Sequence, residues 1–129
     1  MKIRSVLISQ PKPETEKSPY FDVAKSQKVS LEFKPFIHVE GVTAVELRKH
    51  KIDFSEYGCV VLTSKSSVDH YFRLAQEMRF SIPESMKYFC ASETIALYMQ
   101  KYIVYRKRKI FHGTNGVEDL LDNFKKNKT

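Results

Sequence analysis

The amino-acid sequence predicts an α/β fold in which helices alternate with the strands of a largely parallel sheet. Short apolar runs typical of strands are followed along the chain by segments that carry a helical apolar stripe. The connections are short, and several begin with a Ser or Thr that can cap the next helix. A chain of 129 residues, 42% of them hydrophobic, has enough apolar material for one modest core and too little length for two complete domains.

The first third of the chain predicts a strand, a helix and a second strand. The first strand is expected over Ile3–Ser9, and a polar, Pro-rich stretch separates it from a helix over 19–26 that opens with a Ser-Pro pair. Val29–Phe33 alternates apolar and polar residues, as a half-buried strand does. Phe36–Val39 predicts a further extended piece before the next glycine.

The middle of the chain carries the clearest strand signal. A capping box predicts a short helix over 43–50. Cys59–Thr63 is a continuous apolar, β-branched run, which is typical of a strand buried on both faces of a parallel sheet. The next segment has a helical stripe that ends near Met78, and Ser66 and Asp69 stand at the spacing of a capping box.

The same order repeats toward the C-terminus. Met86–Ala91 predicts a strand, and Ser92 is the expected N-cap of a helix over 93–100. Lys109–Phe111 predicts a third, weaker strand, followed by a turn over 113–116. A last helix is indicated by an apolar stripe formed by Val117, Leu120, Leu121 and Phe124.

Composition excludes several classes of protein. No apolar run approaches the roughly 20 residues that a membrane-spanning helix needs, and the N-terminus lacks a signal-peptide core, so we expect a cytoplasmic protein. Cys59 and Cys90 both lie in apolar segments where buried thiols are common. The four histidines are scattered without metal-ligand spacing, so no metal site is expected.

The turns after the predicted strands are the candidate binding site. In a parallel sheet these turns lie at one edge, where open α/β folds bind ligands. They are rich in hydroxyls and place backbone N–H groups at helix N-termini, which favour an anion, although such residues are also ordinary helix caps. Nucleotide-binding loops and nucleophile motifs are absent, so any catalysis would depend mainly on orienting the substrate.

A basic run at Tyr105–Lys109, with Tyr98 and Tyr102 nearby, admits two interpretations. Interleaved with nearby tyrosines, it could form a nucleic-acid patch, since cations and aromatic rings bind phosphates and bases. Such a run is more often a solvated helix end, and the net charge of +7 is modest. We therefore favour the solvated run over a nucleic-acid patch.

Several segments resemble the uroporphyrinogen-III synthase family. Tyr57–Val68 (YGCVVLTSKSSV) is similar to the family's signature of a strand, a Thr-Ser pair, small residues and a valine. Met86–Leu97 looks like the strand and turn that follow it in the family, and the segment GTNGVEDLL looks like a later helix start. The opening VLISQP stands where the family usually has a strand that ends in Arg-Pro. The likeness spans essentially the whole chain and is strongest with the divergent Bacteroidetes-type members.

The resemblance implies flavodoxin-like units and a lyase of tetrapyrrole and heme biosynthesis that uses no cofactor and no metal. Family members take linear hydroxymethylbilane, expel its hydroxyl, invert the last pyrrole ring and close the macrocycle with loss of water. The eight carboxylates of that substrate suit a basic protein whose sheet edge offers donors to anions. The resemblance implies no catalytic acid or base. By position, the residues that it implies contact the substrate are Gln10, Lys12, Thr63, Ser64, Lys65, Ser92 and Thr94. Gln10 stands where the family often has an arginine, whose role Lys12 could fill.

The resemblance also predicts how the chain divides. Residues 1–39 would form the opening strand, helix and strand of a first domain and the outgoing strand of an interdomain ladder. Residues 40–129 would form most of a second α/β domain, without the family's return to the first. We therefore expect the 129-residue chain alone to be inactive or weakly active. Its unfinished sheet leaves edges that could pair across a dimer. The alternative function is a non-catalytic α/β module that binds anions or nucleic acid.

Overall fold

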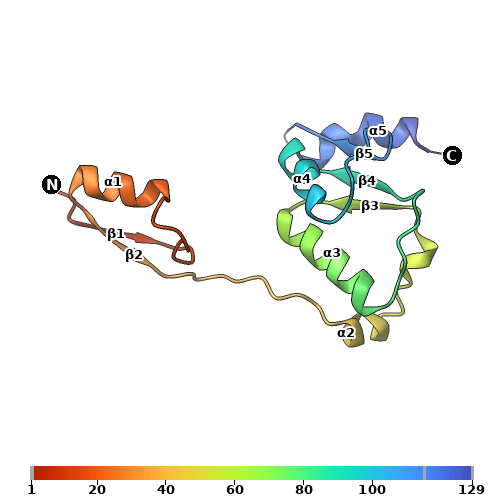
Figure 1. Ribbon diagram of the computed structural model, residues 1–129, viewed down its shortest axis with the longest axis horizontal. Coiled ribbons are helices and arrows are strands. Elements are labelled where there is room, and N and C mark those ends of the chain that lie inside the picture. The colour runs from red at the N-terminus through yellow and green to blue at the C-terminus, as the bar shows by residue number, and fades with distance from the viewer. Residues whose placement is uncertain (1, 115, 129) are drawn as a thin grey trace. The chain divides into compact units, whose positions relative to one another are not determined.

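The protein belongs to the α/β class, with two separate parallel sheets (Figure 1). The computed structural model describes residues 2–114 and 116–128. The chain divides into two compact units, unit 1 (Met1–Glu40) and unit 2 (Gly41–Thr129).

Unit 1 is a single βαβ motif. Strand β1 (Ser5–Ile8) pairs in parallel with β2 (Ser30–Phe33), and helix α1 (Pro19–Gln27) connects them, as predicted. A proline in the first turn of α1 suits a position that has no helical N–H partner. The helix ends at Lys28, which takes the left-handed conformation at φ 53° and returns its N–H to the last turn.

Unit 1 has little core. No residue that the structure describes between Lys2 and Glu40 is fully buried. The ring of Phe33 lies 5.9 Å from those of Tyr20 and Phe21, and this aromatic group holds α1 against the sheet. The opposite face is mostly polar, because the register places Ser5 beside Ser30 and Leu7 beside Glu32. Unit 1 therefore depends on contacts between helix and sheet that are only half-buried.

Phe36–Val39, the expected extended piece, pairs in no sheet. These residues belong to neither helix nor strand and are exposed. A strand is stabilised by hydrogen bonds to a neighbour, and no other segment in the described part of the chain pairs with them.

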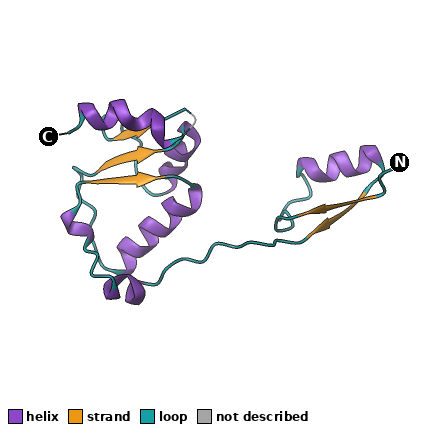
Figure 2. Ribbon diagram, turned by 180° about the vertical axis from the view of Figure 1, so that it is seen from behind, coloured by secondary structure: helices purple, strands orange, loops and turns teal. Residues whose placement is uncertain are grey.

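Unit 2 is built on a three-stranded parallel sheet in the order β3-β4-β5 (Figure 2). The strands are β3 (Cys59–Leu62), β4 (Lys87–Cys90) and β5 (Ile110–His112). The helices are α2 (Ala44–Lys49), α3 (Lys65–Glu77), α4 (Glu93–Tyr98) and α5 (Leu121–Lys126). Short 3₁₀ turns lie at Phe54–Glu56, Met99–Lys101 and Val117–Leu120.

The core of unit 2 lies on one face of this sheet, beneath α3 and α4. Alternate residues of β4, Tyr88 and Cys90, point into it and pack with Leu62, Val68 and Met99. Helix α5 lies on the opposite side of the sheet from α3 (Figures 1 and 2), where the ring of Phe124 is 4.5 Å from that of Phe89. The second face is thus covered only in part.

Two sequence predictions for β3 and α3 are wrong. Strand β3 lies at the edge of the sheet, so Cys59 and Val61 are exposed instead of buried on both faces. Helix α3 begins after Ser64, and Ser66 does not cap it, because Ser64 and Ser67 form the reciprocal capping box. The end of β3 fixes which of the neighbouring serines opens the helix.

The two cysteines should differ sharply in reactivity. Cys59 is exposed, whereas Cys90 is fully buried with its Sγ 3.4 Å from the Met99 sulfur, and burial raises the pKa of the Cys90 thiol to about 11. Because the thiolate is the reactive form, iodoacetamide at pH 8 should modify Cys59 and spare Cys90 until the chain is unfolded. Mass spectrometry with and without urea measures this; equal labelling of both thiols in the native protein would contradict the packing described.

Candidate functional site

The carboxyl edge of the unit 2 sheet brings together five of the seven predicted substrate-binding residues. Thr63, Ser64 and Lys65 follow β3, and Ser92 and Thr94 follow β4, its neighbour in the sheet. Parallel strands end at the same edge, so the two turns lie side by side. The two remaining predicted residues, Gln10 and Lys12, belong to unit 1, where the Tyr20 hydroxyl donates to Gln10 Oε1 at 3.1 Å.

The serine hydroxyls at this edge are engaged by their own helices. Ser64 Oγ accepts from the Ser67 N–H at 3.0 Å, and Ser92 Oγ accepts from the Ile95 N–H at 3.4 Å. These contacts are ordinary helix caps. The groups at this edge that remain for a ligand are the first N–H groups of each helix and the exposed side chains of Thr63, Lys65 and Thr94.

The third predicted turn is described only in part. Gly113 is buried, and its N–H donates to the Cys90 carbonyl at 3.0 Å. The Thr114 N–H donates to Asp119 Oδ2 at 3.0 Å, so a side chain of the segment that follows fixes this turn. Asn115, which the sequence places in the same turn, lies outside the described residues.

Next to the β3 turn lies a polar cluster that sequence reasoning missed, formed by Lys65, Asp69, Tyr98, Lys101 and Tyr102. We call it the Asp69 cluster. The Tyr98 hydroxyl is 3.0 Å from both Asp69 carboxylate oxygens, and the Tyr102 hydroxyl donates to Oδ1. Lys101 Nζ lies 3.6 Å from the same oxygen. The Lys65 and Lys101 ammonium groups lie 5.5 and 5.6 Å from the centre of the Tyr98 ring, within cation–π range.

These contacts set the charge state of the cluster. The hydroxyl of Tyr102 lowers the pKa of Asp69, with smaller help from Tyr98 and Lys101. The Tyr98 hydroxyl and then the Asp69 charge raise the pKa of Lys101, and the Asp69 carboxylate raises the pKa of Tyr102. The formal charges of one aspartate and two lysines give the cluster an excess of one positive charge.

The sequence carries only a faint signal of this cluster. Tyr98 and Tyr102 stand four residues apart, which places both on one side of a helical segment, while Asp69 is remote in the chain. The tyrosines fit an apolar stripe equally well. Only the packing of α4 against α3 brings the carboxylate to them.

Replacing Asp69 by Asn should make the free energy of unfolding less dependent on pH in the acid range. The pKa of Asp69 is lower in the folded chain than the ordinary value of about 4, so its contribution is present above that value and is lost as the pH falls through the lowered one. The difference in urea midpoint between wild type and Asp69→Asn should therefore be largest at pH 7 and should shrink as the pH falls below about 4. Asp122→Asn, at an exposed site in α5, is the control. A difference of equal size at every pH would contradict the role of the charge.

Comparison with family models, characterised proteins and solved structures finds no match. In the described ranges, no group of three His, Cys, Asp or Glu side chains is placed to hold a metal ion. The helices of the same residues are all too short or too polar to cross a bilayer. The interpretation of the site therefore depends on its own geometry and on the resemblance of its segments.

Proposed function

We propose that this chain is a uroporphyrinogen-III synthase, or part of one, and that the carboxyl edge of unit 2 binds carboxylates of hydroxymethylbilane. The observation that carries the proposal is the pairing of two hydroxyl-rich βα turns at one sheet edge beside the lysines of the Asp69 cluster. Each turn presents N–H groups at a helix start, and Lys65 adds an exposed positive charge at the same place.

The charged side chains at this edge predict how each of them affects the binding of an anion. Lys65 and Lys101 favour an anion, and Asp69 is already occupied by two phenols and an ammonium group. Glu93 opposes an anion, because it lies exposed in the first turn of α4 beside Thr94. A bound polycarboxylate should therefore be sensitive to Lys65 and Glu93 in opposite directions.

In the proposed reaction the protein acts mainly by orienting the substrate. Loss of the substrate hydroxyl leaves an electrophilic methylene carbon, and the substituted α-carbon of the last pyrrole ring attacks it to give a spiro intermediate. The bond from that ring to the preceding bridge carbon then breaks and re-forms at the ring's other α-carbon, which inverts the ring. The proton lost from this second α-carbon balances the hydroxide, so that water is the product. Holding several carboxylates at once restricts a flexible linear tetrapyrrole and brings its two ends together. We assign Thr63, Lys65 and Thr94 to direct contact with carboxylates, and Ser64 and Ser92 to fixing the two turns.

Binding of a stable tetrapyrrole octacarboxylate, uroporphyrin, tests the proposal. Its fluorescence should respond saturably to the full chain, and coproporphyrin, with four carboxylates, should bind more weakly. We expect Lys65→Gln to weaken uroporphyrin binding about three- to tenfold and Glu93→Gln to tighten it by about the same factor. Lys126→Gln makes the same change in net charge in α5 and should have less than a twofold effect.

Two results would count against the proposal. One is the absence of saturable binding, and the other is an equal loss in the Lys65 and Lys126 variants. With hydroxymethylbilane as substrate, formation of the type III isomer would establish the activity directly.

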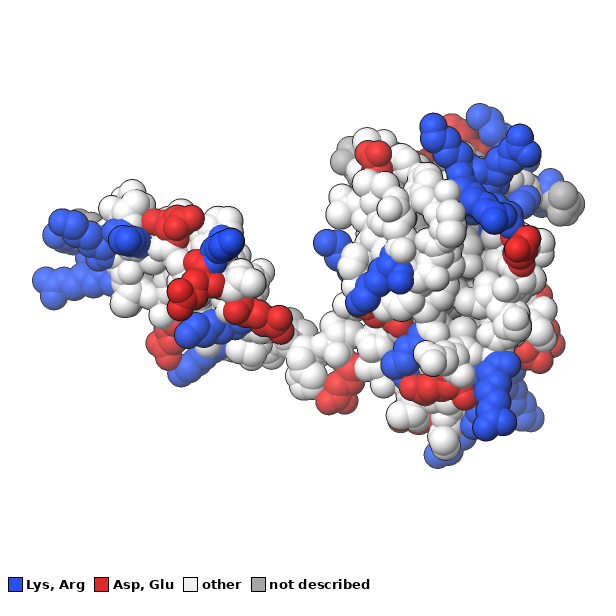
Figure 3. Space-filling view, viewed as in Figure 1, with Lys and Arg blue, Asp and Glu red and all other residues white. Residues whose placement is uncertain are grey.

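The alternative function, a nucleic-acid-binding module, draws on a different surface. Lys and Arg side chains gather around α5 on the face shown in Figure 3, and α5 carries two lysines in its last turn. Binding to RNA or DNA that weakens steeply with salt and on changing Arg106 and Arg108 to Ala would favour this module over the synthase.

A further inference from the structure

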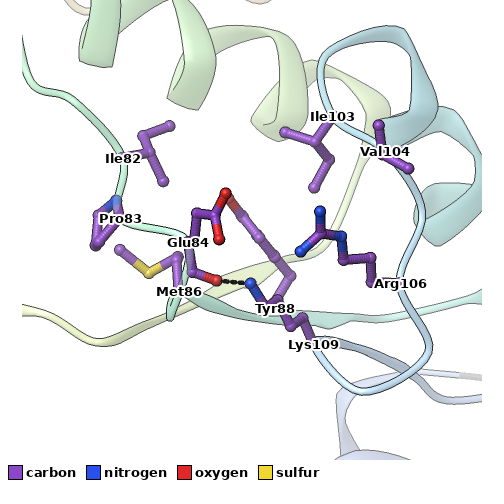
Figure 4. A pocket seen from close by; sticks show the side chains of 9 residues that line it. All are labelled: Ile82, Pro83, Glu84, Met86, Tyr88, Ile103, Val104, Arg106 and Lys109. Carbon is purple, nitrogen blue, oxygen red and sulfur yellow. Dashed lines mark hydrogen bonds between the residues drawn. The ribbon is translucent and has the colours of Figure 1, made fainter.

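Unit 2 has a cavity at the opposite end of its sheet from the candidate site. Its volume is about 250 Å³, and it lies where β4 and β5 begin. The segments on either side are residues 82–86, which lead into β4, and residues 103–109, which lead into β5 (Figure 4). No substrate contact proposed above lies in either segment.

The walls of this cavity are apolar and belong to the folded core. Met86 and Tyr88 are buried, and Ile82 and Ile103 are half-buried against the same core cluster. Val104 is 77% exposed at the mouth. An apolar body can therefore enter without disturbing the core.

Hydrogen bonds fix the two segments that line the cavity. The Met86 N–H donates to the Pro83 carbonyl at 3.0 Å, and the Lys109 N–H donates to the Arg106 carbonyl at 2.9 Å. The Lys109 ammonium group donates to the Glu84 carbonyl and thereby joins the two segments. The walls are thus preorganised, which lowers the entropic cost of binding.

The polar groups at the mouth favour a carboxylate. The Arg106 guanidinium extends toward the cavity between Ile103 and Tyr88 (Figure 4). Arg106 and Lys109 together outweigh the single carboxylate of Glu84, so the lining carries an excess of one positive charge. A guanidinium beside an apolar wall binds a carboxylate through two parallel hydrogen bonds more readily than it binds a neutral group.

We propose that this cavity binds a small monocarboxylate with an apolar body. The apolar part would fill the space against Met86, Tyr88 and Ile103, and the carboxylate would pair with Arg106 at the mouth. The volume is just below the roughly 300–1,000 Å³ of sites for drug-sized ligands, so the ligand is smaller than that class. This site is independent of the synthase proposal.

A titration of the isotope-labelled full chain with 3-phenylpropanoate tests the site, with 3-phenylpropanamide as a neutral probe of the same shape. We expect saturable shifts of the Ile103 and Val104 methyl resonances with the acid and at least tenfold weaker binding of the amide. Arg106→Gln should weaken binding of the acid about tenfold, and Glu84→Gln should tighten it. Arg108→Gln removes a neighbouring charge that does not line the cavity and should change binding less than twofold.

The methyl spectrum of each variant without ligand shows whether the fold is intact, so a loss of binding is read only against a native spectrum. Equal affinity for acid and amide, equal loss in the Arg106 and Arg108 variants, or no saturable shift at millimolar probe would overturn the proposal. Binding that weakens on Glu84→Gln would overturn it as well, because the ligand would then need a positive group.

Discussion

Replacing Leu120 by Ala should lower the free energy of unfolding of unit 2 by about 2–5 kcal/mol, whereas Leu121→Ala should lower it by less than about 1 kcal/mol. The two residues are neighbours and both carry the same side chain. Leu120 is fully buried at the end of a 3₁₀ turn, and Leu121 is 56% exposed at the start of α5. Removing three buried carbons from Leu120 leaves a cavity that the surrounding side chains fill only in part.

Urea unfolding of the two variants, followed by far-ultraviolet circular dichroism, measures the difference. The pair is internally controlled, because composition, helix propensity and net charge change identically. Equal losses of the free energy of unfolding would mean that the last helix is rotated about its axis relative to the structure described. A larger loss for Leu121→Ala would mean that the exposed and buried faces are reversed.

Gly113→Ala should destabilise unit 2 by about 1–3 kcal/mol, because the added methyl has no space. A Cβ at this position would lie 2.5 Å from the Gly116 carbonyl oxygen and 3.2 Å from the Ala91 carbonyl oxygen. Both are backbone atoms, so relief requires the turn after β5 to move. The conformation of Gly113 is not the reason for its presence; the close approach of the neighbouring backbone is.

Gly58→Ala is the matched control. Gly58 precedes β3, and a Cβ there would meet nothing within 4 Å. We expect this variant to be neutral or slightly stabilising, since alanine restricts the unfolded chain. Thermal unfolding of both variants compares them directly, and a loss in Gly58→Ala as large as that in Gly113→Ala would refute the steric explanation.

Local features of the fold could be predicted from the sequence because their causes are local. The order of strands and helices follows from apolar periodicity, and the capping box of α2 follows from a Thr and a Glu three residues apart. In that box the Thr43 Oγ1 accepts from the Glu46 N–H, as the spacing predicts. The parallel pairing of β3 with β4 follows from the helix between them.

Features that depend on sheet order could not be predicted in the same way. The run Cys59–Val61 is equally apolar whether its strand is central or at an edge, and only the position of β3 decides that both ends of this run are exposed. Similarly, Leu120 and Leu121 both fit an apolar stripe, and the 3₁₀ turn that precedes α5 separates them. The Asp69 cluster joins residues 29 to 33 positions apart, a distance at which no sequence period acts.

The candidate site was predictable in location and less so in chemistry. The hydroxyl-rich turns do meet at one sheet edge, but Ser64 and Ser92 serve their helices as caps. The charges that favour an anion come from Lys65, which the sequence marked, and from Lys101, which it did not. A helix cap and an anion site use the same residue types, so only the hydrogen bonds in the structure distinguish one from the other.

The most direct test of the proposed carboxylate-binding edge is to map where uroporphyrin binds. Backbone amide shifts of the isotope-labelled chain should change saturably at residues 63–66 and 92–95, the two adjacent turns of unit 2, and should change less in the Lys65→Gln variant. Shifts confined to α5 and the basic run before β5, with the two turns unaffected, would contradict a carboxylate-binding edge and with it the proposed function.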